Sequence, residues 1–276
     1  IALPQELVEM RQRTFTTGFT GLDDKMGGGA TPGTLTTFVA GPKSGKSMTL
    51  LNVGYYNLSQ PKRTVVHFTC EISERKCKKR YFSRISGINY NLLNDPTMIN
   101  LALERCFEFW ERTQSKLWVK GYPASTANCD AFRSYLYWLE ANHGVKADVV
   151  VIDYVDEVLP IEKKGEVRHD LGQVCKEMRV LAEEFNAPVF TATQGNRESL
   201  SKSVIRMQDV AESIQKVAVS DHIISICKTD TEDQEKRGRF FFAGSREAET
   251  GGIVHFRFDW ATCMMAEIKD LAAFMT

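Results

Sequence analysis

The sequence predicts an α/β fold: a mostly parallel central sheet with helices on both faces and an antiparallel extension at its C-terminal end. Strand-like and helix-like segments alternate along most of the chain. The run "VVVID" at 149–153 is continuously apolar before its final carboxylate, which is typical of a strand buried in a parallel sheet. The last three strand-like segments follow one another closely, as antiparallel hairpins do.

The elements of the first half follow from local patterns. Three glycines at 27–29 and the pair Pro32-Gly33 force a turn before a strand at 34–39. Leu51, Tyr55 and Leu58 recur at helical spacing after it. Further segments are a strand at 64–70, a basic helix at 74–86, an amphipathic helix at 97–113 with Leu101, Phe107 and Trp110 inward, a strand at 117–119 and a helix at 128–142.

In the second half, the helix at 170–186 has the clearest period, with Leu171, Val174, Met178, Leu181 and Phe185 on one face. The strand 188–194 follows it, and a short helix is expected near 209–218. Strands are then expected at 221–228, 239–243, 252–258 and 263–267. With no linker and no repeat, we expect one domain over residues 14–270 after a terminal segment at 1–13, which holds a short helix around 7–11.

Composition excludes some classes of protein. The 276 residues are 43% hydrophobic and 25% charged, which is ordinary for a globular chain. The 35 basic and 35 acidic side chains cancel, so nucleic-acid binding would have to come from local basic loops. No run approaches the roughly 18 apolar residues of a membrane span. The seven cysteines are scattered without metal-ligand spacing, which indicates reduced thiols in a cytoplasm-like compartment and no structural zinc.

The stretch "VAGPKSGKS" from Val39 to Ser47 nearly matches a phosphate-binding loop, whose pattern is Gly, four residues, then Gly-Lys-Ser/Thr. Ala40 stands where the first glycine is usual, which is acceptable if its φ is negative. Gly45, Lys46 and Ser47 supply the turn, the charge and a hydroxyl for Mg²⁺ between a strand and a helix. The expected nucleotide-binding residues are Ala40, Gly41, Pro42, Lys43, Ser44, Gly45, Lys46, Ser47 and Met48.

Three more polar residues each end a predicted strand, at the edge where open α/β sheets bind ligands. They are Glu71, Asp153 and Gln194. Asp153 suits a magnesium role through water, Glu71 could polarise an attacking water, and Gln194 could sense the γ-phosphate. Each alone is more often a surface residue, but together with Lys46 they predict a site for nucleoside triphosphate hydrolysis.

These segments resemble the RecA-like motor domain of the DnaB-like hexameric replicative DNA helicases, phage members included. The resemblance runs from about residue 14 to 260 and is carried by "TGFTGLDD", "FVAGPKSGKS", "FTCEIS", "VVVIDYVDEV", "TATQGNRES" and "DVAESIQKVAVSDHIISI". It implies a RecA-like P-loop ATPase that uses ATP and Mg²⁺ at subunit interfaces, moves 5′→3′ on single-stranded DNA and unwinds duplex. Lys46, Glu71 and Gln194 then act in catalysis, and Ser47 and Asp153 hold the metal.

The C-terminal stretch "AGSREAETG" (243–251) is the most family-specific part of the resemblance. The family has Ala-Lys-x-Arg-Asn-Gly-x-Thr-Gly there, so Arg246 falls on the arginine that reaches into a neighbouring subunit's ATP. Gly244 replaces the companion lysine, which leaves either a single finger or a second cation from Arg237 or Arg239. The resemblance implies a hexameric ring and a nearly inactive monomer. Without the resemblance, a solvated hairpin arginine is the less favoured alternative for Arg246.

Two loops after predicted strands are candidates for contact with DNA phosphates. Their cations are Lys163, Lys164 and Arg168 in the first loop and Arg197, Lys202 and Arg206 in the second. For any one of them, solvated loop surface is as good an explanation. The densest basic run, "RKCKKR" at 75–80, is expected to be a solvated helix face, with a subunit interface or an outer DNA contact as the alternative.

Two other functions stay open. A RecA-type recombinase shares the fold and forms filaments rather than rings. A non-helicase RecA-like ATPase would bind protein with its loops, and stimulation by single-stranded DNA would distinguish it. The expected partners are single-stranded DNA, further copies of the chain, and a primase or helicase loader through an N-terminal domain. The chain begins at Ile1, so we expect a part of a longer protein, acting in the cytoplasm of a bacterium or phage-infected cell, with no membrane contact.

Overall fold

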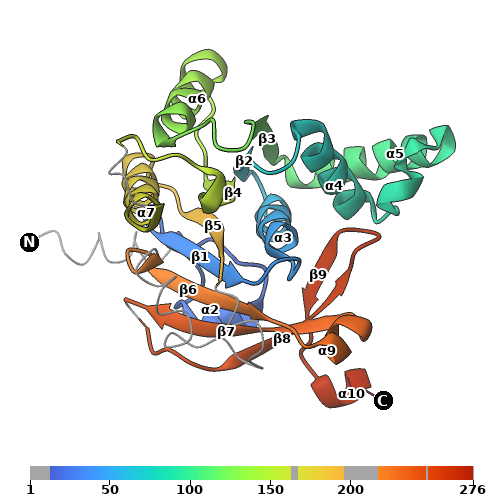
Figure 1. Ribbon diagram of the computed structural model, residues 1–276. Coiled ribbons are helices and arrows are strands. Elements are labelled where there is room, and N and C mark those ends of the chain that lie inside the picture. Colours follow the sequence, from blue (N-terminus) through green and yellow to red (C-terminus); the bar gives the residue numbers. More distant parts are fainter. Residues whose placement is uncertain (1–12, 163–166, 196–216, 247, 276) are drawn as a thin grey trace, which may run out of the picture.

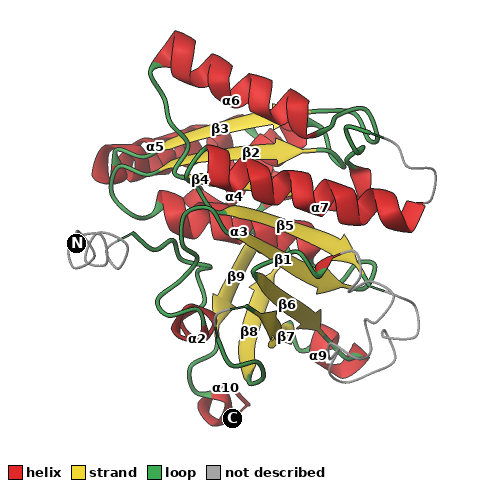
Figure 2. Cartoon of the chain, turned by 90° about the vertical axis from the view of Figure 1, so that its left-hand side faces the viewer, coloured by secondary structure: helices red, strands yellow, loops and turns green. Residues whose placement is uncertain are grey.

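The structure, a computed structural model, describes residues 13–275 except 163–166, 196–216 and 247, and leaves out the side chains of 167–169, 273 and 275. The described strands form one sheet in the order β3-β2-β4-β5-β1-β6-β7-β8-β9 (Figures 1 and 2). The six from β3 to β6 are parallel, and β7 to β9 extend the sheet in antiparallel fashion. The strands are β1 (Leu35–Ala40), β2 (Thr64–Thr69), β3 (Lys116–Gly121), β4 (Val149–Asp153), β5 (Val189–Gln194), β6 (His222–Cys227), β7 (Arg237–Ser245), β8 (Ile253–Asp259) and β9 (Met264–Glu267).

Helices cover both faces of the parallel part, with α6 and α7 on one side and α3, α4 and α5 on the other (Figure 1). The described helices are α2 (Thr20–Lys25), α3 (Lys46–Leu58), α4 (Glu74–Ser86), α5 (Pro96–Thr113), α6 (Cys129–His143), α7 (Val167–Glu184), α9 (Asp230–Gln234) and α10 (Leu271–Met275), with 3₁₀ turns η1 (Tyr90–Asn94) and η2 (Val155–Glu157). No helix among the described residues is long and apolar enough to cross a membrane.

Strand β4 is buried on both faces, which accounts for its continuous run of apolar residues. Successive side chains of a strand point to opposite faces. Val149 and Val151 pack into the core beneath α3 and α4, while Val150 and Ile152 pack into the core beneath α6 and α7. Both faces are buried, so apolar residues are required at every position. The predicted α/β class with an antiparallel C-terminal extension is therefore confirmed.

One local expectation needs correction. Phe107 of α5 does not face inward, because its side chain is 63% exposed. The helix instead buries the smaller Ala102 and Cys106 together with Phe109. Choosing the largest apolar residues of the segment does not identify this buried face. The helices expected around 7–11 and near 209–218 lie outside the described residues, apart from the end of the second.

The segment "TGFTGLDD" contains a helix, α2, that the turn-rich sequence did not predict. Asp23 accepts hydrogen bonds from the Thr17 backbone N–H at 2.7 Å and from the Thr16 hydroxyl, which holds the preceding turn closed. Phe19 is fully buried, and its ring centroid lies 4.6 Å from that of Phe240 on β7. This segment therefore fastens the N-terminal part of the fold to the antiparallel extension.

Candidate nucleotide-binding site

The phosphate-binding loop joins the end of β1 to the start of α3, as the sequence predicted. Ala40 is the last residue of β1, fully buried and paired in register with Gln194. Its φ is not positive, so this position does not require glycine. Gly45 has a φ of 99° at the N-cap of α3, in the left-handed region where glycine is favoured. The loop therefore keeps glycine at Gly45, while Lys43 also adopts a positive φ, 58°, without being glycine.

The loop presents the N-terminus of α3 and the Lys46 ammonium to a ligand. No side chain caps this helix N-terminus, so its first N–H groups are available to an anion. Lys46 Nζ donates to the Gly41 carbonyl at 3.2 Å. Burial lowers the pKa of Lys46, although the charges of Asp156, Glu71 and Asp153 oppose this effect. A bound phosphate would offer this desolvated cation a direct anionic partner.

Ser47, Glu71 and Asp153 meet beside Lys46. Ser47 Oγ lies 3.0 Å from Asp153 Oδ1 and 3.3 Å from Glu71 Oε2. Asp153 is 2% exposed, and burial raises the pKa of its carboxyl to about 7, with the Glu71 charge adding to the rise. The Ser47 hydrogen bond and the charges of Arg80 and Lys46 work in the other direction.

This set of oxygen atoms fits Mg²⁺. Magnesium in proteins is bound through one or two carboxylates together with substrate phosphates and water, rather than by a complete protein cage. Among the described residues, no group of three or more His, Cys, Asp or Glu side chains could hold a metal ion alone. A hydroxyl with two carboxylates matches the partial set that magnesium nucleotide sites use.

Replacing Asp153 with asparagine should stabilise the protein at pH 8 in the presence of a chelator. The folded-state pKa of about 7 lies above the unfolded value of 3.8, so the folded state holds the proton more tightly. Stability is therefore lost as pH rises from about 4 to 7, and asparagine, which has no proton to lose, avoids this loss.

Thermal unfolding of the Asp153→Asn variant and the wild type should give midpoints that differ most at pH 8 and converge near pH 4. The matched control is Asp24→Asn, at an exposed carboxylate of α2. A variant that is less stable than the wild type at pH 8 would show that the Asp153 carboxylate is stabilised in its charged form.

Gln194 ends β5, the strand between β4 and β1, and its side chain is exposed at the same edge of the sheet. Its backbone N–H donates to Asp156 Oδ2 at 3.1 Å, and the Thr193 hydroxyl donates to Asp156 Oδ1 at 3.1 Å. Sequence reasoning missed Asp156, which joins the ends of β4 and β5 and whose charge acts on Lys46. The sequence signal that could have identified Asp156 is its position three residues after Asp153, just past the end of β4.

The site opens into a cavity of about 810 Å³ that extends beyond the phosphate loop. Its lining residues are Lys43, Gly45, Lys46, Ser47, Met48, Glu71, Ile72, Lys76, Arg80, Tyr90, Lys228, Asp233, Trp260 and Cys263. The cavity therefore joins the phosphate loop to α4 on one side and to the turn between β8 and β9 on the other.

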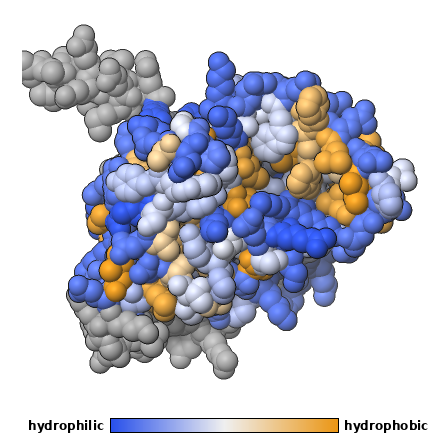
Figure 3. Space-filling model, turned by 90° about the horizontal axis from the view of Figure 1, so that it is seen from above, coloured by the Kyte–Doolittle hydropathy of each residue, from blue (hydrophilic) through white to orange (hydrophobic). Residues whose placement is uncertain are grey.

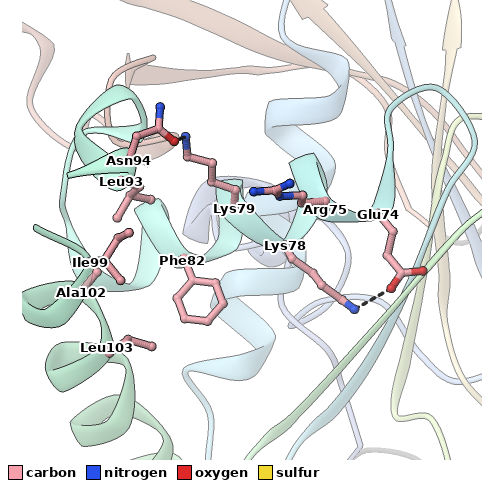
Figure 4. A pocket seen from close by; sticks show the side chains of 10 residues that line it. All are labelled: Glu74, Arg75, Lys78, Lys79, Phe82, Leu93, Asn94, Ile99, Ala102 and Leu103. Atoms are coloured by element: carbon pink, nitrogen blue, oxygen red, sulfur yellow. Dashed lines mark hydrogen bonds and ion pairs between the residues drawn. The ribbon is translucent and has the colours of Figure 1, made fainter. Parts of the chain in front are cut away.

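The basic run 75–80 lies on α4 with its cations exposed or partly buried, and these cations border two cavities. Lys76 and Arg80 line the nucleotide cavity. Arg75, Lys78 and Lys79 line a second cavity of about 490 Å³, with apolar side chains from α4, η1 and α5 (Figure 4). Figure 3 shows apolar atoms gathered on the side of the molecule where α4 and α5 lie. The exposure of Arg75, Lys76 and Lys78 agrees with the expected solvated helix face, and the structure adds that this face borders two cavities.

Arg246 lies at the edge of the sheet opposite the phosphate loop. Its backbone N–H donates to the Asp221 carbonyl at 3.0 Å, and its Nη1 lies 3.8 Å from Asp221 Oδ1. Asp221 in turn accepts from the N–H of Leu35, the first residue of β1, at 2.9 Å. The five residue steps from there to Ala40 span about 17 Å. Arg246 therefore cannot reach the phosphate loop of its own chain.

Arg237 and Arg239 cannot act as companions of Arg246. Both side chains bind Glu232: Arg237 Nη1 lies 3.1 Å from Oε1, and Arg239 Nη2 lies 3.0 Å from Oε2. In the sheet Arg239 pairs with Cys227, while Ser245 pairs with His222 at the other end of β6. The suggested second cation from either arginine is thus wrong, because the length of β7 separates it from Arg246.

The DNA-contact candidates Lys163, Lys164, Arg197, Lys202 and Arg206 lie outside the described residues. Arg168 lies in the first turn of α7, and its side chain is also outside the description. The two segments that carry them follow β4 and β5, which are neighbouring parallel strands. The chain leaves β4 after Asp153 and β5 after Gln194, both at the edge that carries the phosphate loop.

Comparisons with known proteins point in one direction. The model of the family described as DnaB-like helicase C terminal domain matches residues 14–265. The DnaB-like replicative helicase of Enterobacteria phage T4 is 27% identical over 212 residues, which are 74% of this chain and 44% of that protein. The replicative DNA helicase DnaB of Mycoplasma pneumoniae is 25% identical over 241 residues, 83% of this chain and 50% of that protein. The chain spans about half the length of these relatives.

Solved structures share the fold. One solved ATPase domain superposes with a TM-score of 0.79 at 17% identity and covers 97% of both chains. A DnaB-like replicative helicase studied with its primase interactions gives a TM-score of 0.76 at 17% identity, covering 93% of this chain and 64% of that one. The RadB recombinase gives 0.58 at 18% identity, covering 93% of this chain and all of its own.

Proposed function

Because the chain belongs to the family of DnaB-like helicase C-terminal domains, we propose that it is the ATP-hydrolysing motor of a replicative DNA helicase. The observation that carries the proposal is the separation of the two halves of one site. Lys46, Ser47, Glu71 and Asp153 gather at one edge of the sheet, and Arg246 lies at the opposite edge. A second copy must supply Arg246 to complete the site, as in a ring with sites between subunits.

In the proposed mechanism each residue has one task. The N-terminus of α3 and Lys46 bind the phosphates of ATP. Ser47 and Asp153 would hold Mg²⁺, which would neutralise charge on the phosphate oxygens. Glu71 orients the attacking water and accepts its proton, and Gln194 contacts the γ-phosphate from the adjacent strand. Arg246 of a neighbouring copy stabilises the charge that develops during transfer.

We further propose that residues 1–13 are a linker to other domains and that residues 14–270 are the motor, arranged in a hexameric ring. The ring moves 5′→3′ along single-stranded DNA in the cytoplasm of a bacterium or phage-infected cell. A primase or helicase loader would be engaged through an N-terminal domain. Supporting this, the structure solved with primase interactions is a DnaB-like helicase that shares this fold.

A RecA-type recombinase is the second candidate, and it is less favoured. RadB shares the fold over most of this chain, but its TM-score of 0.58 is lower than the 0.79 of the solved ATPase domain. The family model that matches is that of the DnaB-like helicases. Closed rings rather than helical filaments in electron micrographs would separate the two functions.

Single-stranded DNA should stimulate ATP hydrolysis by the wild-type protein, and Lys46→Ala should abolish hydrolysis with or without DNA. A Lys163/Lys164/Arg197 triple alanine variant should keep its basal ATPase activity but lose stimulation and bind DNA more weakly. Three cations that neutralise phosphates account for a slope of log affinity against log salt of about −2 for single strands, so the slope should flatten by that amount.

The matched control for this charge change removes three exposed lysines, Lys62, Lys116 and Lys146, which precede β2, begin β3 and precede β4. These lysines lie at the edge of the sheet opposite the phosphate loop, so their loss should leave the stimulation of ATP hydrolysis by single-stranded DNA unchanged. If single-stranded DNA did not stimulate ATP hydrolysis by the wild type, the function of a non-helicase ATPase would be favoured. Unchanged binding in the first variant would place the DNA contact on other residues.

A further inference from the structure

The 810 Å³ cavity at the phosphate loop extends to an exposed tryptophan. Trp260 lies in the turn between β8 and β9, and its side chain is 45% exposed. Its Cη2 atom lies 3.5 Å from the point where a Cβ on Gly45 would stand, so the indole borders the phosphate loop. Trp260 also lines the same cavity as Lys46 and Ser47. An aromatic ring of this size is therefore within reach of a ligand whose phosphates occupy the loop.

The turn that carries Trp260 is held firmly by polar contacts. Asp259 accepts from the Ala261 N–H at 2.9 Å and from the Thr262 hydroxyl at 2.7 Å. The Ala261 carbonyl accepts from the Tyr90 N–H of η1 at 2.6 Å. Asn52 of α3 donates to the Cys263 carbonyl at 3.0 Å. These contacts fix the turn to the helices around the cavity, so the ring is pre-positioned and its ordering cost on binding is small.

Only one part of the indole is covered. The Phe258 ring packs against it with centroids 4.9 Å apart, and Lys228 Nζ lies 5.5 Å from the indole centroid. Lys228 also donates to Asp233 at 2.7 Å and to the Lys43 carbonyl at 3.4 Å. Lys228 thus ties the tryptophan to the phosphate loop from one side, and the exposed remainder of the ring faces the cavity.

We propose that Trp260 is the stacking platform for the base of the bound nucleoside triphosphate, and that the site consequently prefers purine nucleotides. The inference rests on the proposed ATPase function and adds the part of the site that recognises the base. Stacking on an aromatic ring needs no particular hydrogen-bonding edge, so ATP and GTP bind similarly. The smaller ring of CTP or UTP covers less of the indole and binds more weakly.

The test measures dissociation constants for Mg²⁺ complexes of ATP, CTP and inorganic tripolyphosphate, the last of which has no base. Trp260→Ala should weaken ATP binding by about tenfold to a hundredfold, the effect of removing one base-stacking contact. Its affinity for tripolyphosphate should stay at the wild-type value, and its preference for ATP over CTP should fall toward unity. Trp260→Phe, which keeps an aromatic ring, should recover most of the ATP affinity.

Trp138→Ala is the matched control, because Trp138 on α6 is also 45% exposed and does not line the cavity. In steady-state hydrolysis Trp260→Ala should raise KM while kcat is kept, since stacking is the same in ground and transition states. ATP binding of wild-type strength in Trp260→Ala would overturn the stacking assignment alone. An equal loss for tripolyphosphate would overturn it too, by showing that Trp260 only supports Gly45. A wild type that binds no Mg²⁺-ATP would overturn the proposed function as well.

Discussion

An Arg246→Ala variant should lose ATP turnover by a factor on the order of 10³ or more while binding ATP as tightly as the wild type. An arginine supplied to the transferred phosphoryl group contributes on this scale. Among the residues that the structure describes, the Arg246 side chain has Asp221 as its ion-pair partner, and it is 47% exposed. Its removal should therefore leave the phosphate loop of the same chain undisturbed. Initial rates with saturating ATP and binding of a non-hydrolysable analogue measure the two quantities.

Mixing two inactive variants separates a finger supplied by a neighbour from a residue needed for folding. When Arg246→Ala and Lys46→Ala chains assemble together, some interfaces combine an intact loop from the first with an intact arginine from the second. Partial turnover should return in the mixture and depend on the mixing ratio. Arg257→Ala, at an exposed arginine of β8, is the control and should be fully active. Full turnover of Arg246→Ala alone would remove the finger assignment.

A Glu71→Gln variant should lose turnover by about 10²- to 10⁴-fold, the range that a positioned general base contributes. Glutamine keeps the length of the side chain and can still contact Ser47, but it cannot take a proton from water. Glu71 also raises the pKa of Asp153, so its neutralisation should make the Asp153 carboxylate easier to ionise. Binding of Mg²⁺-ATP is therefore expected to persist, and the variant should hold ATP uncleaved.

Rapid-quench measurement of a single turnover would show whether the chemical step itself has slowed. Glu108→Gln, at an exposed position of α5, provides the matched control. If Glu71→Gln cleaved bound ATP at the wild-type rate, the general-base role would pass to another group near the γ-phosphate. If the variant bound no Mg²⁺-ATP, Glu71 would instead be a ligand-binding residue.

Local patterns were sufficient for much of the fold. The buried run 149–153 and the clear helical period of α7 both depend on the faces that a segment buries, and this information lies within a few residues. The strand-end positions of Glu71, Asp153 and Gln194 were also predictable, because parallel strands end at a common edge. The inward direction of Phe107 was not, since packing against α4 selected smaller residues of α5.

The chain order alone was enough to predict the loop between β1 and α3, the positions of Glu71 and Asp153 near Lys46 and the class of fold, but not the place of Asp156. The order of the strands in space was needed to place Arg246, the run 75–80 and Trp260 relative to the phosphate loop. It separates Arg246 from the loop of its own chain by the length of β1, divides the run 75–80 between two cavities, and brings Trp260 beside Gly45. These relations join residues that are distant in sequence through sheet pairing and helix packing, and no short-range periodicity encodes such distances.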